Sequence, residues 1–234
     1  YYSGASGLMG IKIKTKNKTN ICIMIKKPNI GLIGCGYWGN NLMRNFCQLG
    51  VLKTVCDKNE FASERVKKLS KKVYFTNNYE ELLNDKDIDA VVIATPAKTH
   101  FKIVEKALNS KKHVFVEKPL CLNYKDGKKL LDLSRRLNLK LMVGHLLLYH
   151  PAFIKMKDKI EKGLIGKIRY IYSNRLALGK LRKEEDVLWS FAPHDISMIL
   201  NLINEKVVSV DAFGGSYIKS KVKDTSLTIL KFKN

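Results

Sequence analysis

A short apolar segment that runs directly into closely spaced glycines constrains this sequence more than any other feature. The segment is Asn29-Ile-Gly-Leu-Ile33, and the glycines that follow form Gly34-Cys-Gly-Tyr-Trp-Gly39. A helical pattern begins at the last glycines and continues to about residue 49. Strand, glycine turn and helix in this order predict the opening crossover of an α/β sheet, because glycine permits turns that other side chains obstruct.

Each glycine of this pattern has a physical role to fill. Gly34 permits the tight turn, Gly36 lets the backbone approach a diphosphate, and Gly39 lets the helix pack on the strand. The helix then begins at Tyr37 and Trp38, where free N–H groups and a partial positive charge face the phosphates. The glycine string alone is weak support, and a plain strand-to-helix turn is the alternative.

An acidic residue at the end of the second predicted strand strengthens the prediction of a dinucleotide site. Asp57 follows Gly39 by eighteen residues (57 − 39), close to the ~20-residue offset of the acid that binds the adenosine ribose. Its negative charge would repel a 2′-phosphate, so the sequence favours NAD over NADP. The alternative is that Asp57 is an ordinary turn residue.

Strand and helix patterns alternate along the first part of the chain, which predicts a doubly wound α/β domain with a parallel sheet of the Rossmann type over residues 28–148. Continuous apolar strands such as residues 90–94 suit a sheet covered on both faces. The expected strands lie near residues 29–33, 51–56, 73–75, 90–94, 113–116 and 140–143. The expected helices lie near residues 38–49, 60–71, 79–84, 99–109, 124–137.

The pattern changes after residue 148 and predicts a second, α+β domain over residues 149–234 with an open antiparallel or mixed sheet. Its expected elements are helices near 151–161 and 192–203 and strands near 168–178, 206–217 and 225–232. The chain stops inside or just after a strand, so we expect this domain to be incomplete. We expect it to form the substrate side of a cleft.

The first 27 residues are rich in Lys and Asn and show little periodicity. We expect residues 1–27 to be a non-native or disordered leader, and Met24 to be a candidate native start. The opening residues, 1–10, lack the basic start, apolar middle and cleavage site of a secretory signal. No apolar run reaches the ~18–20 residues of a membrane span, so we expect a soluble, cytoplasmic protein with no membrane partner.

The formal net charge of +22 raises nucleic-acid binding as another function. Lysines are spread over nearly every segment, however, and no aromatic-flanked basic motif accompanies them, so a lysine-rich solvated surface explains the charge better and we expect no nucleic-acid partner. The five cysteines contain no Cys-x-x-Cys pair and are odd in number. We expect reduced structural thiols and no metal site.

One further motif makes the prediction more specific. The segment Val114-Phe-Val-Glu-Lys-Pro-Leu120 resembles the Glu-Lys-Pro motif of the glucose–fructose oxidoreductase/inositol dehydrogenase (Gfo/Idh/MocA) family. Residues 90–100 are similar to the family's strand and loop beneath the nicotinamide, and residues 144–151 to its crossing into the second domain. The resemblance implies NAD as cofactor, with Thr95, Pro96, His100, Glu117 and Lys118 joining the glycines and Asp57 in its site. An ordinary helix-start histidine is the alternative for His100.

Residues 173–175 and 188–197 resemble the branch of this family that acts on nucleotide-linked sugars, including UDP-N-acetylglucosamine-type 3-dehydrogenases. The resemblance implies hydride transfer between a sugar carbinol carbon and nicotinamide. It implies Lys118 and His194 as catalytic groups, because a lysine can bind the substrate oxygen and a histidine can accept its proton. An exposed lysine and a helix-start histidine are the alternatives.

Ser190 stands where the family often has an aspartate, four residues before the histidine, so the division of labour between Lys118 and His194 is open. Asp195 is a candidate substitute, although neighbours at a helix start usually point apart.

Tyr149, Asn174, Arg175 and His194 are the candidate substrate contacts, with Arg175 suited to a phosphate or carboxylate. The equal alternative is that Tyr149, Asn174 and Arg175 are ordinary surface or core residues that contact no substrate. A non-catalytic NAD- or sugar-binding protein of the same fold is the alternative function. Family members commonly pair through the open sheet of the second domain, so we expect a homo-oligomer if that sheet is complete.

Overall fold

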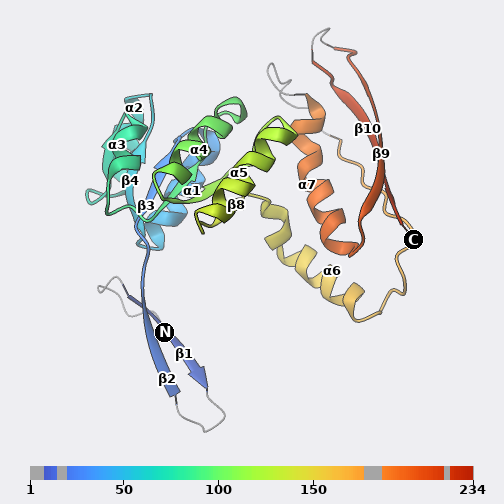
Figure 1. The fold of residues 1–234 in the computed structure, drawn as a ribbon, viewed down its shortest axis with the longest axis horizontal. Helices are drawn as coiled ribbons and strands as arrows, with labels where there is room; N and C mark the ends of the chain where they lie inside the picture. The colour runs from blue at the N-terminus through green and yellow to red at the C-terminus, as the bar shows by residue number, and fades with distance from the viewer. Residues whose placement is uncertain (1–7, 15–19, 177–185, 219–221, 234) are drawn as a thin grey trace. The chain divides into compact units, whose positions relative to one another are not determined.

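The computed structural model describes residues 8–14, 20–176, 186–218 and 222–233. The chain divides into two compact units, Tyr1–Val143 and Gly144–Asn234 (Figure 1). The first contains a six-stranded sheet with its helices, and the second contains helices and a two-stranded sheet.

The six strands of the first unit are all parallel and follow the order β5-β4-β3-β6-β7-β8. Because β3 is first in the sequence of this sheet, the chain winds outward from it twice, once toward β5 and once toward β8. The carboxyl ends of β3 and β6 therefore flank the point where the winding reverses, which is where ligands bind in open α/β sheets. The strands are β3 (Ile30–Ile33), β4 (Leu52–Cys56), β5 (Tyr74–Thr76), β6 (Ala90–Ile93), β7 (His113–Val116) and β8 (Leu141–Val143).

The helices that connect these strands lie at the predicted positions within one to two residues at either end. They are α1 (Tyr37–Gln48), α2 (Phe61–Leu69), α3 (Tyr79–Asn84), α4 (His100–Asn109), preceded by the short 3₁₀ turn η1 (Ala97–Thr99), and α5 (Tyr124–Arg136). Two of them begin at an asparagine side chain that accepts from the helix backbone, Asn78 for α3 and Asn123 for α5. Such caps satisfy amides that the first turn leaves unpaired.

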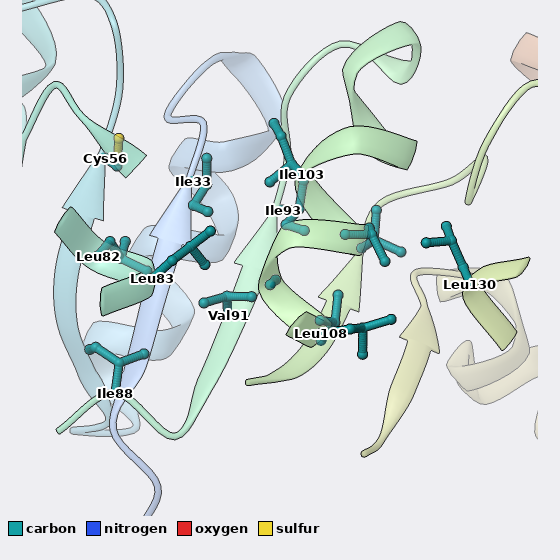
Figure 2. Packing of buried hydrophobic residues seen from close by; sticks show 14 of the residues in the cluster. Ile33, Cys56, Leu82, Leu83, Ile88, Val91, Ile93, Ile103, Leu108 and Leu130 are labelled. Atoms are coloured by element: carbon teal, nitrogen blue, oxygen red, sulfur yellow. The ribbon is translucent and has the colours of Figure 1, made fainter. Parts of the chain in front are cut away.

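Neighbouring residues of the central strands face two separate hydrophobic cores. Leu32 and Val92 pack with Met43 of α1 and Val66 of α2. The other face contributes the residues next to them, such as Ile93, to a core that α3, α4 and α5 complete (Figure 2). A strand alternates its side chains between faces, and both faces here are apolar because helices cover both.

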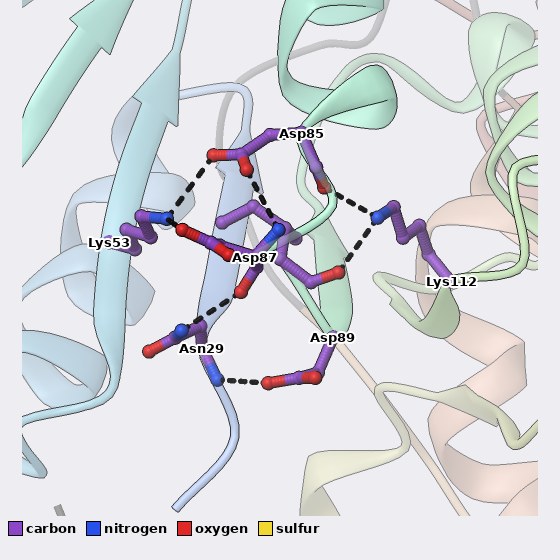
Figure 3. Close-up of polar contacts among 7 residues, drawn as sticks. Asn29, Lys53, Asp85, Asp87, Asp89 and Lys112 are labelled. Carbon is purple, nitrogen blue, oxygen red and sulfur yellow. Dashed lines mark hydrogen bonds and ion pairs between the residues drawn. The ribbon is translucent and has the colours of Figure 1, made fainter.

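A polar cluster fixes the opposite, amino end of the sheet (Figure 3). Lys112 immediately precedes β7, is 6% exposed, and donates to the carbonyls of Asp85 and Ile88 over 2.6 and 2.8 Å. Burial lowers the pKa of Lys112, and the charges of Asp85 and Asp89 partly offset this. The Asp89 carboxylate accepts from the amide of Asn29 over 2.7 Å. The turn before β6 is thereby tied to the starts of β3 and β7.

The second unit begins with a short 3₁₀ turn, η2 (Leu146–Tyr149), and α6 (Pro151–Glu161). Proline occupies the first turn of α6, where a missing N–H costs nothing, and the His150 ring accepts from the Ala152 amide. The unit ends with the antiparallel pair β9 (Val207–Gly215) and β10 (Thr225–Phe232). These elements agree with the predicted ones.

Two predictions for the second unit were wrong. Residues 168–176 form no strand, and none of the strand pairings among the described residues involves them; apolar content alone does not make a strand, which needs a neighbour for its backbone hydrogen bonds. Residues 177 and 178 of that expectation lie outside the described residues. Helix α7 (Val187–Leu202) begins five residues before the expected start, because Asp186 caps it by accepting from the Trp189 amide over 2.9 Å.

The region predicted to be a leader contains an antiparallel hairpin, β1 (Leu8–Lys14) with β2 (Asn20–Lys26). The assignment of residues 1–27 as a leader, and the domain limits at residues 28 and 148, stay predictions.

Candidate functional site

The glycine turn after β3 has the geometry that its sequence predicts. Gly34 has φ +94°, and a Cβ there would lie 2.7 Å from the Ala94 carbonyl carbon. A Cβ on Gly39 would overlap the Gly34 carbonyl oxygen, so helix α1 packs directly on the turn. Both positions therefore require glycine.

Gly36 differs from these two, because a Cβ built on it meets no atom within 4 Å. Its φ is −70°, which any residue adopts, so neither packing nor backbone strain explains a glycine there. Gly36 is also the N-cap of α1, and no side chain caps the helix. The turn therefore leaves open space in front of the first-turn amides, and a diphosphate fits such a cradle.

Asp57, the first residue after β4, holds this turn from one side. Its Oδ2 accepts from the Cys35 amide over 2.6 Å, and its Oδ1 accepts from the Asn59 amide over 2.8 Å. Arg65 of α2 donates from the other side to the Cys35 carbonyl over 3.0 Å. The peptide groups on both sides of Cys35 are thus fixed by opposite charges. A carboxylate has about four acceptor positions, so Asp57 retains capacity for ribose hydroxyls.

The loop after β6 contains a hydrogen-bond chain with a fixed direction. Thr99 Oγ1 donates to the Pro96 carbonyl over 2.7 Å, and Thr95 Oγ1 lies 2.7 Å from Thr99 Oγ1. Because a hydroxyl has one proton, Thr95 donates to Thr99. The Thr95 oxygen therefore presents only lone pairs to any ligand.

Glu117, the first residue after β7, contacts the first turn of α1, the helix that follows the glycine turn. Its carboxylate accepts from Trp38 Nε1 over 2.7 Å. Burial raises the pKa of Glu117, while the Trp38 indole, the Lys118 amide and the charges of Lys118 and His100 partly offset that effect. One residue further on, the Lys118–Pro119 peptide bond is cis.

His100 lies beneath these loops and is 1% exposed. Its Nδ1 lies 2.7 Å from the Pro119 carbonyl and its Nε2 lies 2.8 Å from the Thr95 carbonyl. Both ring nitrogens are occupied by backbone, so the ring contacts the loops that would hold a cofactor. The structure thus brings the predicted cofactor residues of the first unit to the carboxyl ends of β3, β4, β6 and β7.

In the second unit, Arg175 and Asp195 form a bidentate ion pair with N–O distances of 2.7 and 3.1 Å. Ser173 donates to the same carboxylate over 2.8 Å. Burial alone would raise the pKa of Asp195, but the hydrogen bonds from Arg175 and Ser173 and the charges of Arg175 and His194 outweigh it and lower that pKa. The Asp195 carboxylate therefore already binds Arg175 and Ser173. This leaves it less available to replace the aspartate that the family often has four residues before the histidine.

The remaining candidates of the second unit lie in α7, in η2 and in the segment that contains Arg175. His194 follows Pro193 within α7, and its carbonyl accepts from the Ser197 hydroxyl over 2.8 Å. Ser190 lies one turn earlier and is 3% exposed. Tyr149 is 63% exposed at the end of η2, and Asn174 is exposed next to Arg175.

Sequence reasoning missed two residues and one pairing that shape these sites. Arg65 is one cation among many in a lysine-rich chain, and only its contact with Cys35 distinguishes it. Cys35 occupies a variable position of the glycine pattern. The pairing of Asp195 with Arg175 joins residues twenty apart in sequence, and no pattern in the sequence signals it.

A parallel sheet wound in this order, with an uncapped glycine cradle at its switch point, defines a dinucleotide-binding protein of the Rossmann class. Comparison with known families agrees. The family model described as "Oxidoreductase family, NAD-binding Rossmann fold" matches residues 28–145, and the "GFO/IDH/MocA C-terminal domain" model matches residues 153–234. The chain belongs to the Gfo/Idh/MocA family of NAD-binding oxidoreductases.

Similar proteins include sugar dehydrogenases. The chain is 28% identical over 220 residues to myo-inositol 2-dehydrogenase of Thermotoga maritima, covering 88% of this chain and 65% of that one. It is 30% identical over 193 residues to UDP-N-acetylglucosamine 3-dehydrogenase of Acidithiobacillus ferrooxidans, covering 82% and 59%. A solved structure of the Acidithiobacillus enzyme superposes with a TM-score of 0.77 at 28% identity, over 88% of this chain and 63% of that one. The chain thus spans less than two thirds of the length of these relatives.

Within the described residues, no helix has both the length and the apolar character needed to cross a membrane.

Proposed function

We propose that this protein is an NAD-dependent oxidoreductase that acts on a CH–OH group of a nucleotide-linked sugar. Bound NAD would supply the hydride acceptor, so that the carbinol carbon loses hydride to the nicotinamide and the hydroxyl oxygen loses a proton to the protein. The roles of the protein are to bind both molecules, to orient them and to accept that proton.

The observation that carries this proposal is the open space in front of Gly36. Packing explains Gly34 and Gly39, and an approaching ligand would explain a glycine at position 36, whose Cβ would meet nothing. The amides of Tyr37 and Trp38 would bind the diphosphate there. Asp57 would accept the ribose hydroxyls and exclude a 2′-phosphate, which selects NAD over NADP.

The nicotinamide end would lie over Thr95, Pro96 and Lys118, which follow β6 and β7. Lys118 is the proposed group that binds the substrate oxygen, and His194 is the proposed acceptor of its proton. Ser190 offers no carboxylate, and Asp195 already accepts from Arg175 and Ser173. We assign the proton to His194, whose charge acts on the neighbouring Asp195 carboxylate.

The substrate preference rests on Arg175. Asp195 occupies two of the five guanidinium N–H groups, which leaves three donors on a fixed fork. Such a fork suits a phosphate oxygen pair, as in the diphosphate of a nucleotide-linked sugar. Tyr149 and Asn174 are the proposed contacts to the remainder of that substrate.

Two measurements test the proposal. Calorimetry with the purified chain should show NADH binding, and no binding of NADH or NAD would overturn the cofactor assignment. Turnover with a panel of nucleotide-linked sugars, followed by NADH absorbance, should be abolished in Lys118→Ala with NADH affinity largely retained. Lys125→Ala, an exposed lysine of α5, is the matched control, and retained turnover in Lys118→Ala would refute its role.

A non-catalytic NAD- or sugar-binding protein is the second candidate, favoured by the serine at position 190. It predicts NADH binding with no hydride transfer to any sugar tested. Restoring an acid with Ser190→Asp separates the two functions, because an enzyme weakened at this position gains turnover and a binding protein does not.

Self-association through the second unit is also proposed. The strands β9 and β10 expose Phe213, Leu227 and Ile229 at 64%, 57% and 41%. Exposed apolar side chains on neighbouring strands are typical of a surface that a partner covers. Light scattering of the purified chain should show a dimer or larger species, and Phe213→Asp should convert it to monomer.

A further inference from the structure

The ring of His100 lies between two backbone carbonyls that belong to different loops. Thr95 follows β6, and Pro119 follows β7 in the Glu-Lys-Pro motif. The two ring nitrogens lie 2.8 and 2.7 Å from these oxygens, and the side chain is 1% exposed.

The two contacts set a condition on the protons of the ring. A neutral imidazole has one N–H and one bare nitrogen, and a carbonyl oxygen only accepts. In a neutral ring one nitrogen lone pair would therefore face an oxygen lone pair at hydrogen-bond distance. Only the doubly protonated ring donates to both carbonyls.

A buried positive charge requires a compensating one. Glu117, two residues before Pro119, is the candidate counter-charge: the charge of His100 helps to lower the pKa of this carboxyl, against the larger raising effect of burial. The start of α4 opposes a positive charge, and its first turn contains no acidic residue. The two short carbonyl contacts and the Glu117 carboxylate are the features that would stabilise a positive charge on the His100 ring.

We propose that His100 is a positioning residue, protonated on both ring nitrogens, that clamps the loop after β6 to the loop after β7 and so sets the nicotinamide end of the cofactor site. This inference rests on the proposed function, because the clamped loops contain Thr95 and Lys118. His100 itself touches only backbone, and acts through the residues that it holds.

The protonation state can be read from nitrogen NMR spectra of protein with ¹⁵N-labelled histidine at neutral pH. His100 should show two ring nitrogens of the N–H type. His113 is an internal reference in the same spectrum, because its Nδ1 accepts from the Lys140 amide over 3.0 Å and must be bare. A bare nitrogen on His100 would overturn the proposal. The His100 signals are assigned by their loss in His100→Gln, or, if that variant does not fold, by substituting the other histidines one at a time.

A second measurement separates positioning from general support of the fold. ADP-ribose contains the adenosine and diphosphate but lacks the nicotinamide, so it should reach the glycine turn without the clamped loops. His100→Gln offers a donor from one atom only, and we expect NADH affinity to fall by about tenfold or more while ADP-ribose affinity stays within about twofold. His113→Gln should leave both affinities unchanged.

The outcomes are distinguishable from a failure of the proposed function. If the unsubstituted protein binds neither NADH nor ADP-ribose, the cofactor assignment itself fails. If it binds both and His100→Gln binds NADH normally, or loses both ligands equally, the positioning role is overturned while the cofactor assignment stands.

Discussion

Trp38, in the first turn of α1, donates its indole N–H to the Glu117 carboxylate over 2.7 Å, although the two residues lie 79 positions apart. This contact joins the glycine turn to the Glu-Lys-Pro segment, the two motifs that the sequence analysis identified separately. Trp38 is 39% exposed, so its ring packs only partly.

Trp38→Phe keeps most of the apolar ring and removes the N–H. We expect the Glu117 carboxylate to lose a hydrogen-bond donor at a partly exposed position, which should lower the free energy of unfolding by about 0.5–1.5 kcal/mol. NADH affinity should fall more than ADP-ribose affinity, because Glu117 adjoins Lys118. Calorimetry with the two ligands measures this, and an equal loss of both would contradict it.

Glu117→Gln should make unfolding less dependent on pH. Burial raises the pKa of Glu117 above its ordinary value of 4.5. The folded state therefore holds the proton to higher pH than the unfolded state, and stability falls as pH rises from about 4.5 through the folded pKa. Denaturation at several pH values checks the slope, which the variant should lack. An unchanged slope would assign the effect to another group.

Gly36→Ala and Gly39→Ala should fail in different ways. The new Cβ at position 36 meets only open space, so we expect unchanged stability and a loss of NADH affinity of about tenfold or more, because it occupies the diphosphate cradle. The new Cβ at position 39 meets the Gly34 carbonyl, so we expect lower thermal stability. Equal NADH affinity in Gly36→Ala and the unsubstituted protein would remove the main support for the cofactor site.

Asp195→Asn should destabilise the second unit at neutral pH by about 1 kcal/mol, a value kept low because the Arg175 side chain is 35% exposed. The pKa of Asp195 is lowered from 3.8, so its contribution is present above pH 3.8 and is lost as pH falls through the folded pKa. Trp189 is the one tryptophan of this unit, so its fluorescence in a Trp38→Phe background follows unfolding there. Asp158→Asn, which removes an exposed pair with Lys162, should change stability far less.

Lys112→Met should destabilise the first unit by about 2 kcal/mol or more, because two carbonyls lose their donor at a buried position. Methionine retains the apolar stem, so the loss measures hydrogen bonding more than packing. Trp38 fluorescence in a Trp189→Phe background reports this unit. Lys125→Met is the control, and equal effects would show that Lys112 acts as an ordinary surface lysine.

The sequence by itself determined the parallel sheet and the glycine turn, because strand alternation, glycine and Asp57 act over short distances along the chain. It also indicated the family through the Glu-Lys-Pro segment. It misplaced the start of α7, because Pro193 lies inside that helix although proline usually marks a helix start. It also predicted a strand over 168–178, where residues 168–176 have no pairing partner.

Only the tertiary structure decided which polar groups form hydrogen bonds and ion pairs with one another. Periodicity reports whether a residue faces a core, but not which distant atom lies opposite it. Three contacts join segments from separate parts of the chain. They are the hydrogen bond of Trp38 with Glu117, the contacts of His100 with two carbonyls, and the ion pair of Arg175 with Asp195. Hydrogen bonds depend on distances of a few tenths of an ångström, and the packing of the elements sets those distances.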